Sequence, residues 1–167
     1  MDYKIIDNFF TKKDLNKVLE IADVVKYSDT PPKNVFWVGE RSESLHKNYA
    51  DFFNYVGSKL IQFTWGNHFS CNYNLELAFH KLTSKHKANN SWFHQDKDSI
   101  FAGVIYLSKN PSKNTGTIIK DKKTIANKYN RAVIYNSALT HRVENTFDTR
   151  LTLTFFFNKL SFNYANT

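Results

Sequence analysis

Two stretches decide the fold: WFHQDKDSIFAGVIYLSKNPSKNTGTII at residues 92–119 and NRAVIYNSALTHRVENTFDTRLTLTFFF at residues 130–157. Both contain runs rich in Phe, Tyr, Ile, Val and Thr, the composition of strands. The predicted strands of the whole chain are 74–82, 101–107, 115–120, 131–136 and 149–158, and the polar loops between them are 83–91, 108–114 and 121–130. Several strands at this spacing, with no helices between them, predict an antiparallel sandwich or barrel.

The first third of the chain reads differently, with apolar residues at helical spacing. Thr11 followed by Asp14 is a capping-box pattern, and the apolar rhythm after it predicts a helix that ends before Pro31 and Pro32. A second helix is predicted over about residues 45–63. The sequence therefore predicts a mainly β protein with N-terminal helices. We expect one domain over residues 1–167, with residues 1–65 as helical support and 66–160 as the β core.

The composition narrows the class of protein. The chain has 167 residues, of which 16% are aromatic, so it can bury a core and is not expected to be disordered. Its single cysteine, Cys71, cannot form an internal disulfide, which fits a reducing compartment. No segment approaches the ~20 apolar residues of a membrane span, and the N-terminus lacks the pattern of a signal peptide. The net charge of +8 suits an anionic partner, but the lysines are scattered among loops and form no stripe.

Three residues in the stretches 92–119 and 130–157 have the spacing and side-chain types of metal ligands. His94 and Asp96 are two positions apart, so on an extended backbone their side chains point to the same side. His141 follows the apolar strand AVIYN and can supply a third ligand from another strand. Two histidines and one carboxylate leave coordination positions open, the arrangement of non-haem Fe(II) oxygenases, whereas a structural zinc site would need cysteines or a fourth ligand.

Arg150 adds a second chemical requirement. It opens the apolar strand RLTLTFFF nine residues after His141, and an arginine buried there is costly unless it meets an anion. Its planar fork matches a carboxylate, and Thr152 and Thr154 share its face of the strand. Metal ligands with one inward-facing cation describe a site for a small dicarboxylate that chelates the metal at its other end.

On these residues the sequence resembles the 2-oxoglutarate/Fe(II)-dependent dioxygenase superfamily, on the prolyl-4-hydroxylase-like branch of small bacterial and phage-type members. The motif is His94-Gln95-Asp96, then His141, then Arg150, and the resemblance covers roughly residues 74–158. It implies a double-stranded β-helix, a cupin-like jelly-roll barrel. The strand VIYLS supplies Tyr106 where that branch has a tyrosine that binds the same carboxylate as the arginine, and Thr152 is a secondary candidate for this contact.

The resemblance also implies the chemistry. Fe(II) would be held by His94, Asp96 and His141, with 2-oxoglutarate and O2 as co-substrates and succinate and CO2 as products. The expected outcome is hydroxylation of a peptidyl, prolyl-type or free amino-acid side chain by a cytoplasmic protein, bacterial or in the host cytoplasm if viral.

Two other functions stay open from the sequence. The first is nucleic-acid demethylation of the AlkB type, which is less favoured because the R-x-N-x-T-x-R signature of those enzymes is here Arg150-Leu-Thr152-Leu-Thr154-Phe-Phe156. The second is a non-catalytic jelly-roll binding domain whose basic loops, 83–90 and 120–128, hold an acidic partner. The sequence decides neither the oligomeric state nor whether these loops act as lids.

Overall fold

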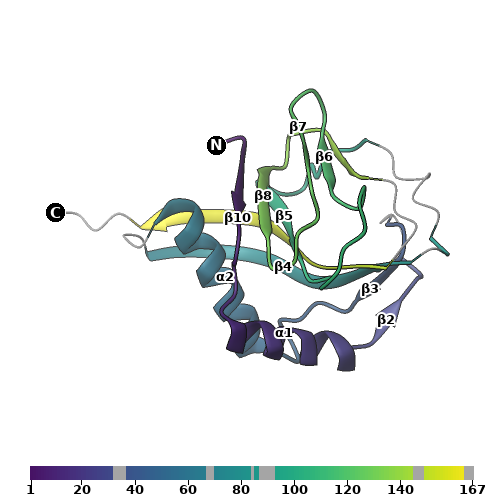
Figure 1. The fold of residues 1–167 in the computed structure, drawn as a ribbon. Coiled ribbons are helices and arrows are strands. Elements are labelled where there is room, and N and C mark those ends of the chain that lie inside the picture. Colours follow the sequence, from purple (N-terminus) through teal and green to yellow (C-terminus); the bar gives the residue numbers. More distant parts are fainter. Residues whose placement is uncertain (32–36, 67–69, 84, 87–92, 145–148, 164–167) are drawn as a thin grey trace.

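The protein is built from two antiparallel β-sheets and two helices (Figure 1). The computed structural model describes residues 1–31, 37–66, 70–83, 85–86, 93–144 and 149–163. Helices α1 and α2 lie on one side of the long β4–β10 strand pair, and the small second sheet lies on the other side (Figure 1). None of the helices within these ranges is long and apolar enough to cross a membrane.

Helix α1, Lys12–Val24, begins where the capping pattern predicts. The Thr11 side chain accepts a hydrogen bond from the Asp14 backbone N–H at 3.2 Å, which satisfies a donor that the first turn leaves open. Helix α2 spans Ala50–Trp65 and ends at Gly66, whose φ of 93° few other residues adopt. It starts five residues later than predicted, because Leu45 is buried and its N–H bonds the carbonyl of Leu77 on β4.

The larger sheet has seven strands and carries most of the predicted β core. Its spatial order is β1 (Tyr3–Ile6), β8 (Ala132–Asn136), β5 (Phe101–Tyr106), β10 (Arg150–Asn163), β4 (Ser70–Leu82), β3 (Glu40–Ser42) and β2 (Tyr27–Ser28). The second sheet has three strands in the order β7 (Lys123–Ile125), β6 (Thr117–Ile119) and β9 (His141–Val143). Two antiparallel sheets facing each other confirm the predicted sandwich class.

The register of the large sheet separates its two faces. Thr154 of β10 lies opposite Ala78 of β4 and Val104 of β5, so these three residues point to the same side of the sheet. The intervening residues of β10, with Phe155 as an example, point to the opposite face. That face packs against the helices in the main core, which includes Val18, Leu60, Leu77, Phe79, Ile105, Leu153, Phe155 and Phe157.

The other face looks toward the small sheet. It carries Val104, Tyr106, Val133 and Tyr135, which pack with Ile119 of β6 in a second cluster. The functional residues predicted on β10 belong to this face, so the cavity of the sandwich lies between the two sheets.

Three details of the predicted layout differ from the structure. Residues 1–65 are not only helical support, because β1, β2 and β3 pair into the seven-stranded sheet. The predicted strand 149–158 continues to Asn163, and 115–120 shortens to Thr117–Ile119. The short strands β7 and β9 were missed, because three residues are too few to show a period of two.

Candidate active site

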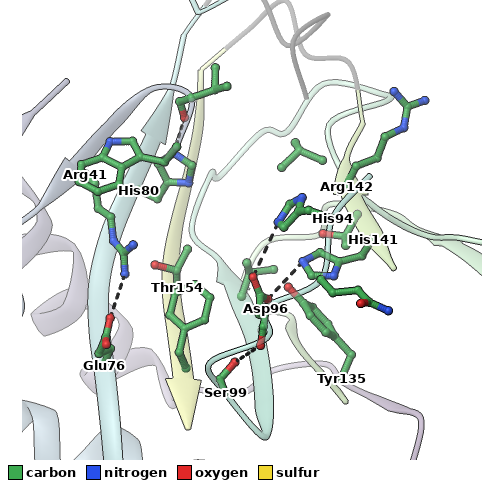
Figure 2. A pocket seen from close by; sticks show the side chains of 18 of the residues that line it. Arg41, Glu76, His80, His94, Asp96, Ser99, Tyr135, His141, Arg142 and Thr154 are labelled. Atoms are coloured by element: carbon green, nitrogen blue, oxygen red, sulfur yellow. Dashed lines mark hydrogen bonds and ion pairs between the residues drawn. The ribbon is translucent and has the colours of Figure 1, made fainter. Parts of the chain in front are cut away.

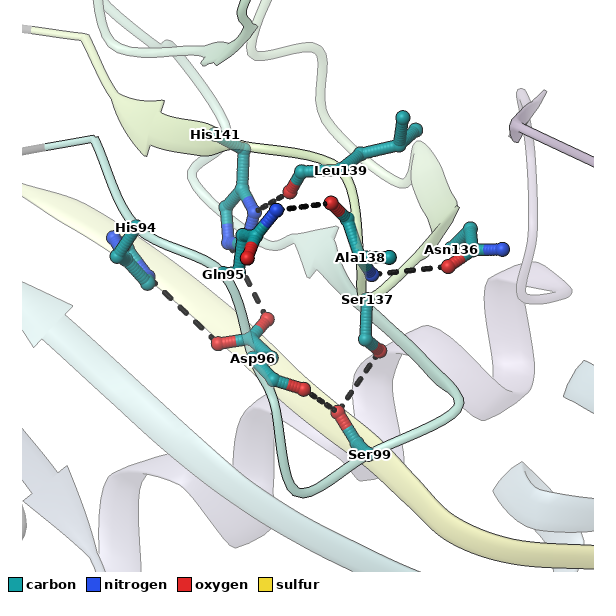
Figure 3. A network of polar contacts seen from close by, with 9 residues as sticks. All are labelled: His94, Gln95, Asp96, Ser99, Asn136, Ser137, Ala138, Leu139 and His141. Atoms are coloured by element: carbon teal, nitrogen blue, oxygen red, sulfur yellow. Dashed lines mark hydrogen bonds and ion pairs between the residues drawn. The ribbon is translucent and has the colours of Figure 1, made fainter.

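Backbone hydrogen bonds bring the three predicted metal ligands together. The N–H of His94 donates to the carbonyl of His141 at 3.0 Å, and the reciprocal bond measures 2.9 Å. Two residues on, the N–H of Asp96 donates to the carbonyl of Ser137 at 3.1 Å. The segment that contains His94 and Asp96 is therefore paired with the segment that leads into β9 (Figure 3).

The ligand atoms of His94, Asp96 and His141 lie within 4.8 Å of one another. The two Asp96 carboxylate oxygens face different imidazoles: Oδ2 lies 3.3 Å from Nε2 of His141, and Oδ1 lies 3.7 Å from Nε2 of His94 (Figure 2). Asp96 Oδ2 is buried and makes no hydrogen bond with the residues that the structure describes. A buried carboxylate oxygen beside two ring nitrogens suits a bound cation.

Hydrogen bonds around the ligands fix their orientation. Nδ1 of His141 lies 2.9 Å from the carbonyl oxygen of Leu139, which can only accept, so Nδ1 carries the proton and Nε2 presents its lone pair to the metal site. The Tyr135 ring packs against the His141 imidazole, with the two ring centroids 4.4 Å apart. The Ser99 hydroxyl donates to the carbonyl of Asp96 at 3.0 Å and also bonds the Ser137 hydroxyl (Figure 3).

Arg150 is buried at the start of β10, with 1% of its surface exposed. Its Nε donates to the carbonyl of Thr115 at 2.9 Å, but among the described residues Nη2 has no acceptor although it is buried. Arg150 also lines the cavity that holds the three metal-ligand candidates. A buried guanidinium nitrogen without an acceptor is costly, and a carboxylate in the cavity would satisfy it.

Tyr106 lies beside Arg150, as predicted, but its hydroxyl is engaged. The guanidinium carbon of Arg150 is 5.3 Å from the Tyr106 ring centroid, and the Tyr106 hydroxyl lies 2.7 Å from Oγ1 of Thr117. Burial raises the pKa of Tyr106, with Arg150 opposing the change, so the phenol stays protonated at neutral pH. Thr117 lines the cavity and presents its hydroxyl next to this phenol.

Thr152 occupies a different position from the one expected for a carboxylate ligand. It is fully buried, and its hydroxyl is directed to the His80 carbonyl on β4 at 3.4 Å. It is not among the residues that line the cavity, whereas Thr154 is. Its predicted part in carboxylate binding therefore stays a prediction without support from this geometry.

The cavity has a volume of about 580 Å³ and includes residues that the sequence did not single out. Arg41 and Glu76 line the side opposite the metal-ligand candidates, with Thr154 between the two sides (Figure 2), and Trp37 lines the cavity beside Arg41. Tyr135 also lines it. Alternation along β8 could have placed Tyr135 on the face of Val133. The short strand β3, which carries Arg41, gave no such signal.

His80 of β4 also lines this cavity. One of its ring nitrogens, Nε2, lies 2.6 Å from the carbonyl of Val38 and so donates to it. Burial lowers the pKa of His80 to about 4, with the neighbouring Arg150 and Arg41 acting in the same direction, so the ring is neutral at physiological pH. Arg142 also lines the cavity, with its guanidinium carbon 5.0 Å from the Phe93 ring centroid. Trp92 and His68 lie outside the described residues.

The sequence and the structure were compared with those of known proteins. No protein-family model matches the sequence, and no curated protein matches it. Solved structures do match. A 2OG-Fe(II) oxygenase family oxidoreductase from Burkholderia pseudomallei is 14% identical with a TM-score of 0.68, over 93% of this chain and 84% of that one.

Two further similar structures carry ligands. HygX from Streptomyces hygroscopicus, with nickel and 2-oxoglutarate bound, is 12% identical with a TM-score of 0.70, over 93% of this chain and 82% of that one. A Trichoplax adhaerens prolyl hydroxylase, in complex with a hypoxia inducible factor peptide fragment, is 13% identical with a TM-score of 0.61, over 93% and 83%. The fold is therefore the jelly-roll of the 2-oxoglutarate/Fe(II) oxygenases, which confirms the predicted fold class.

Proposed function

We propose that this protein is an Fe(II)- and 2-oxoglutarate-dependent dioxygenase that hydroxylates a peptidyl or amino-acid side chain. The observation that carries the proposal is the pairing of two features in one cavity. One is the His94, Asp96 and His141 cluster, and the other is the buried Arg150 nitrogen without an acceptor. A metal and a dicarboxylate together would satisfy both features.

In this proposal the side chains have separate tasks. His94, Asp96 and His141 hold Fe(II), and the Leu139 carbonyl keeps the His141 ring in the tautomer that can bind metal. Arg150 binds the distal carboxylate of 2-oxoglutarate with its free Nη2 group. Tyr106 holds the hydroxyl of Thr117, which lines the cavity and offers a further hydrogen bond to the same carboxylate.

When bound, iron and 2-oxoglutarate supply an oxidative decarboxylation that yields succinate and CO2 and delivers one oxygen atom of O2 to a C–H bond. The protein positions these ligands and excludes water from the cavity. The apolar side chains of Val104 and Phe156 line the cavity and limit the water that reaches the metal-ligand candidates. His80 is neutral there, so it does not compete with Arg150 for the co-substrate's charge.

Two observations support the substrate class. The similar prolyl hydroxylase of Trichoplax adhaerens holds a peptide, and the open cavity here has room for a side chain beside the metal-ligand candidates. The cluster of His94, Asp96 and His141 favours an enzyme over a non-catalytic binding domain, because a binding domain has no need for metal ligands. A substrate in the cavity also accounts for the polar residues on its far side.

Product analysis tests the proposal. Protein loaded with Fe(II), 2-oxoglutarate and O2 is expected to release succinate and to add 16 Da to a member of a panel of proline-containing peptides and free amino acids. His94→Ala should abolish both products, whereas His46→Ala should leave them unchanged, because His46 is exposed and is not among the residues that line the cavity. Repair of methylated nucleic acid with no product from the panel would contradict the substrate class.

A further inference from the structure

Arg41 is a cation on the side of the cavity that the metal and co-substrate do not use. It lies on β3, opposite His80 of β4, and lines the cavity across from the metal-ligand candidates (Figure 2). Its guanidinium carbon is 5.5 Å from the Trp37 ring centroid and 5.2 Å from that of Phe156. Both rings are within the range of cation–π attraction, so the guanidinium is held in place before any ligand arrives.

The charge of Arg41 is poorly neutralised within the protein. Among the described residues its ion pair is to Glu76, with Nη2 and Oε2 3.9 Å apart, which is too long for a hydrogen bond. The Glu76 side chain is 55% exposed, and its other oxygen accepts from Asn158 at 3.0 Å. Burial lowers the pKa of Arg41, while Glu76 and Asp96 oppose the change. A mostly buried guanidinium with one long ion pair retains donors for an anion.

Trp37 lies beside Arg41 in the same wall of the cavity. Its indole Nε1 is buried and, among the residues that the structure describes, has no hydrogen-bond acceptor. Because the Arg41 guanidinium lies over the Trp37 ring, a carboxylate bound by Arg41 would lie close to this indole and change the environment of its N–H group.

We propose that Arg41 and Trp37 form an anchoring subsite for a carboxylate of the substrate. The inference rests on the proposed function and deepens it, because it names the chemical class that the same site selects. The substrate carries a carboxylate that binds Arg41, and the reacting C–H bond lies toward the metal-ligand candidates. Arg41 is thus a residue of substrate specificity, distinct from Arg150, which binds the co-substrate.

The surroundings of Arg41 leave room for such a substrate. A second cavity of about 440 Å³ adjoins the first, and Trp37, Arg41 and Glu76 line both. A ligand anchored at Arg41 therefore sits at the junction, with one part toward the metal-ligand candidates and the rest toward β2 and the end of α1. The carboxylate could be the α-carboxylate of an amino acid or the side chain of an acidic residue in a peptide.

The indole N–H signals of the protein test the subsite directly. The chain has three tryptophans, and Trp65 is a built-in control, because it packs against Phe101 on the helix side at 5.1 Å between centroids. The ¹⁵N-labelled protein, with Zn(II) and saturating 2-oxoglutarate, is titrated with N-acetylglycine and with a blocked Ac-Ala-Glu-Ala-NH2 peptide. The matched neutral probes are N-acetylglycinamide and Ac-Ala-Gln-Ala-NH2. The titrations are repeated on metal-free protein without 2-oxoglutarate.

The expected result is a saturable shift of the Trp37 signal with at least one carboxylate probe and none with its amide. Whichever carboxylate binds more tightly identifies the source, and either preference supports the subsite. Arg41→Gln should weaken binding about tenfold or more, since a charge-assisted pair is lost. Arg41→Lys should weaken it less, because it keeps the charge but not the fork. Arg142→Gln, which removes a cation elsewhere on the cavity wall, should leave it unchanged.

The subsite is refuted if the Trp37 signal responds equally to carboxylates and amides, or if Arg41→Gln binds as the unaltered protein does while its Trp65 signal shows an intact fold. Equal weakening by Arg142→Gln would also refute it, because the effect would then be the general charge of the cavity. The metal-free titration separates the two proposals. If a carboxylate probe binds the metal-free protein but the iron-loaded protein shows no turnover, the subsite is supported and the proposed oxygenase activity is contradicted.

Discussion

Arg150 and Thr152 share one face of β10 but have different surroundings, and their variants should differ accordingly. The Arg150 guanidinium has a buried nitrogen without an acceptor among the described residues, whereas the Thr152 hydroxyl is directed to the His80 carbonyl. Arg150→Gln should weaken 2-oxoglutarate binding about 10- to 100-fold while Fe(II) still binds. Calorimetric titration of both ligands measures this. Thr152→Val is the matched control, and a comparable loss there would restore Thr152 as a carboxylate ligand.

His80 makes stability depend on pH. Its pKa is about 4 in the folded protein, below the ordinary value of 6.5, so between these values the unfolded chain binds a proton that the folded chain does not. The free energy of unfolding should therefore rise with pH from about 4 to 6.5 and lose this contribution as the pH falls through the same window. Urea unfolding at several pH values measures the slope. His80→Gln should flatten it, and an unchanged slope would assign the effect to other groups.

The large strands could be predicted from the sequence, and the small ones could not. Strands β4, β5, β8 and β10 are apolar runs of five residues or more, long enough for the pattern to appear. Strands β2 and β3 have two and three residues and exist because of their pairing: β3 pairs with the edge of β4, and β2 pairs with β3. Because β3 was not predicted, there was no reason from the sequence to place Arg41 in the cavity. His94 and Asp96 could be recognised because their spacing in the sequence is enough to place both side chains on one side of the chain. Trp37 and Arg41 could not, because only the folded structure brings them to the cavity.

The closeness of β5 and β8 requires Gly103. A Cβ at this position would lie 2.0 Å from the carbonyl oxygen of Val133 and 2.4 Å from the Phe155 ring. Gly103→Ala must therefore separate strands at the centre of the sheet and should destabilise the protein by about 1–3 kcal/mol or more. Chemical denaturation measures the loss. Gly57→Ala in α2 is the control, because the group it approaches is the tip of the Tyr73 ring and alanine favours a helix. Equal losses would show that the β5–β8 contact is not the cause.

For the whole molecule, the two sheets meet where the proposed ligands would bind, so binding should stabilise the entire fold. The metal-ligand candidates come from the 94–96 segment and β9, while Arg150 begins β10 of the other sheet. A divalent metal with 2-oxoglutarate at about 100 times the dissociation constant should add roughly 2.7 kcal/mol. In a protein of this size that raises the melting temperature by about 5–11 °C. Calorimetry should show this shift in the unaltered protein and none in Asp96→Ala; a shift of equal size in Asp96→Ala would place the ligands elsewhere.

At the same scale, the similar structures share only 12–14% of their residues with this chain over 93% of its length. The fold is therefore specified by the alternation of apolar residues along the long strands and by the pairing of β4 with β10, which many sequences can satisfy. The cavity wall includes Arg41 of β3 and Glu76 of β4. In the proposed function, substrate choice depends on such side chains, because the jelly-roll alone does not determine it.

In the proposed function, one cavity binds Fe(II) and 2-oxoglutarate together. The most direct measurement is a titration of 2-oxoglutarate into the Fe(II)-loaded protein without oxygen, which follows the visible metal-to-ligand charge-transfer absorption. We expect a saturable band that is absent in His141→Ala and that needs more 2-oxoglutarate in Arg150→Ala. A well-folded protein with no band, or with a band that survives His141→Ala, would contradict it.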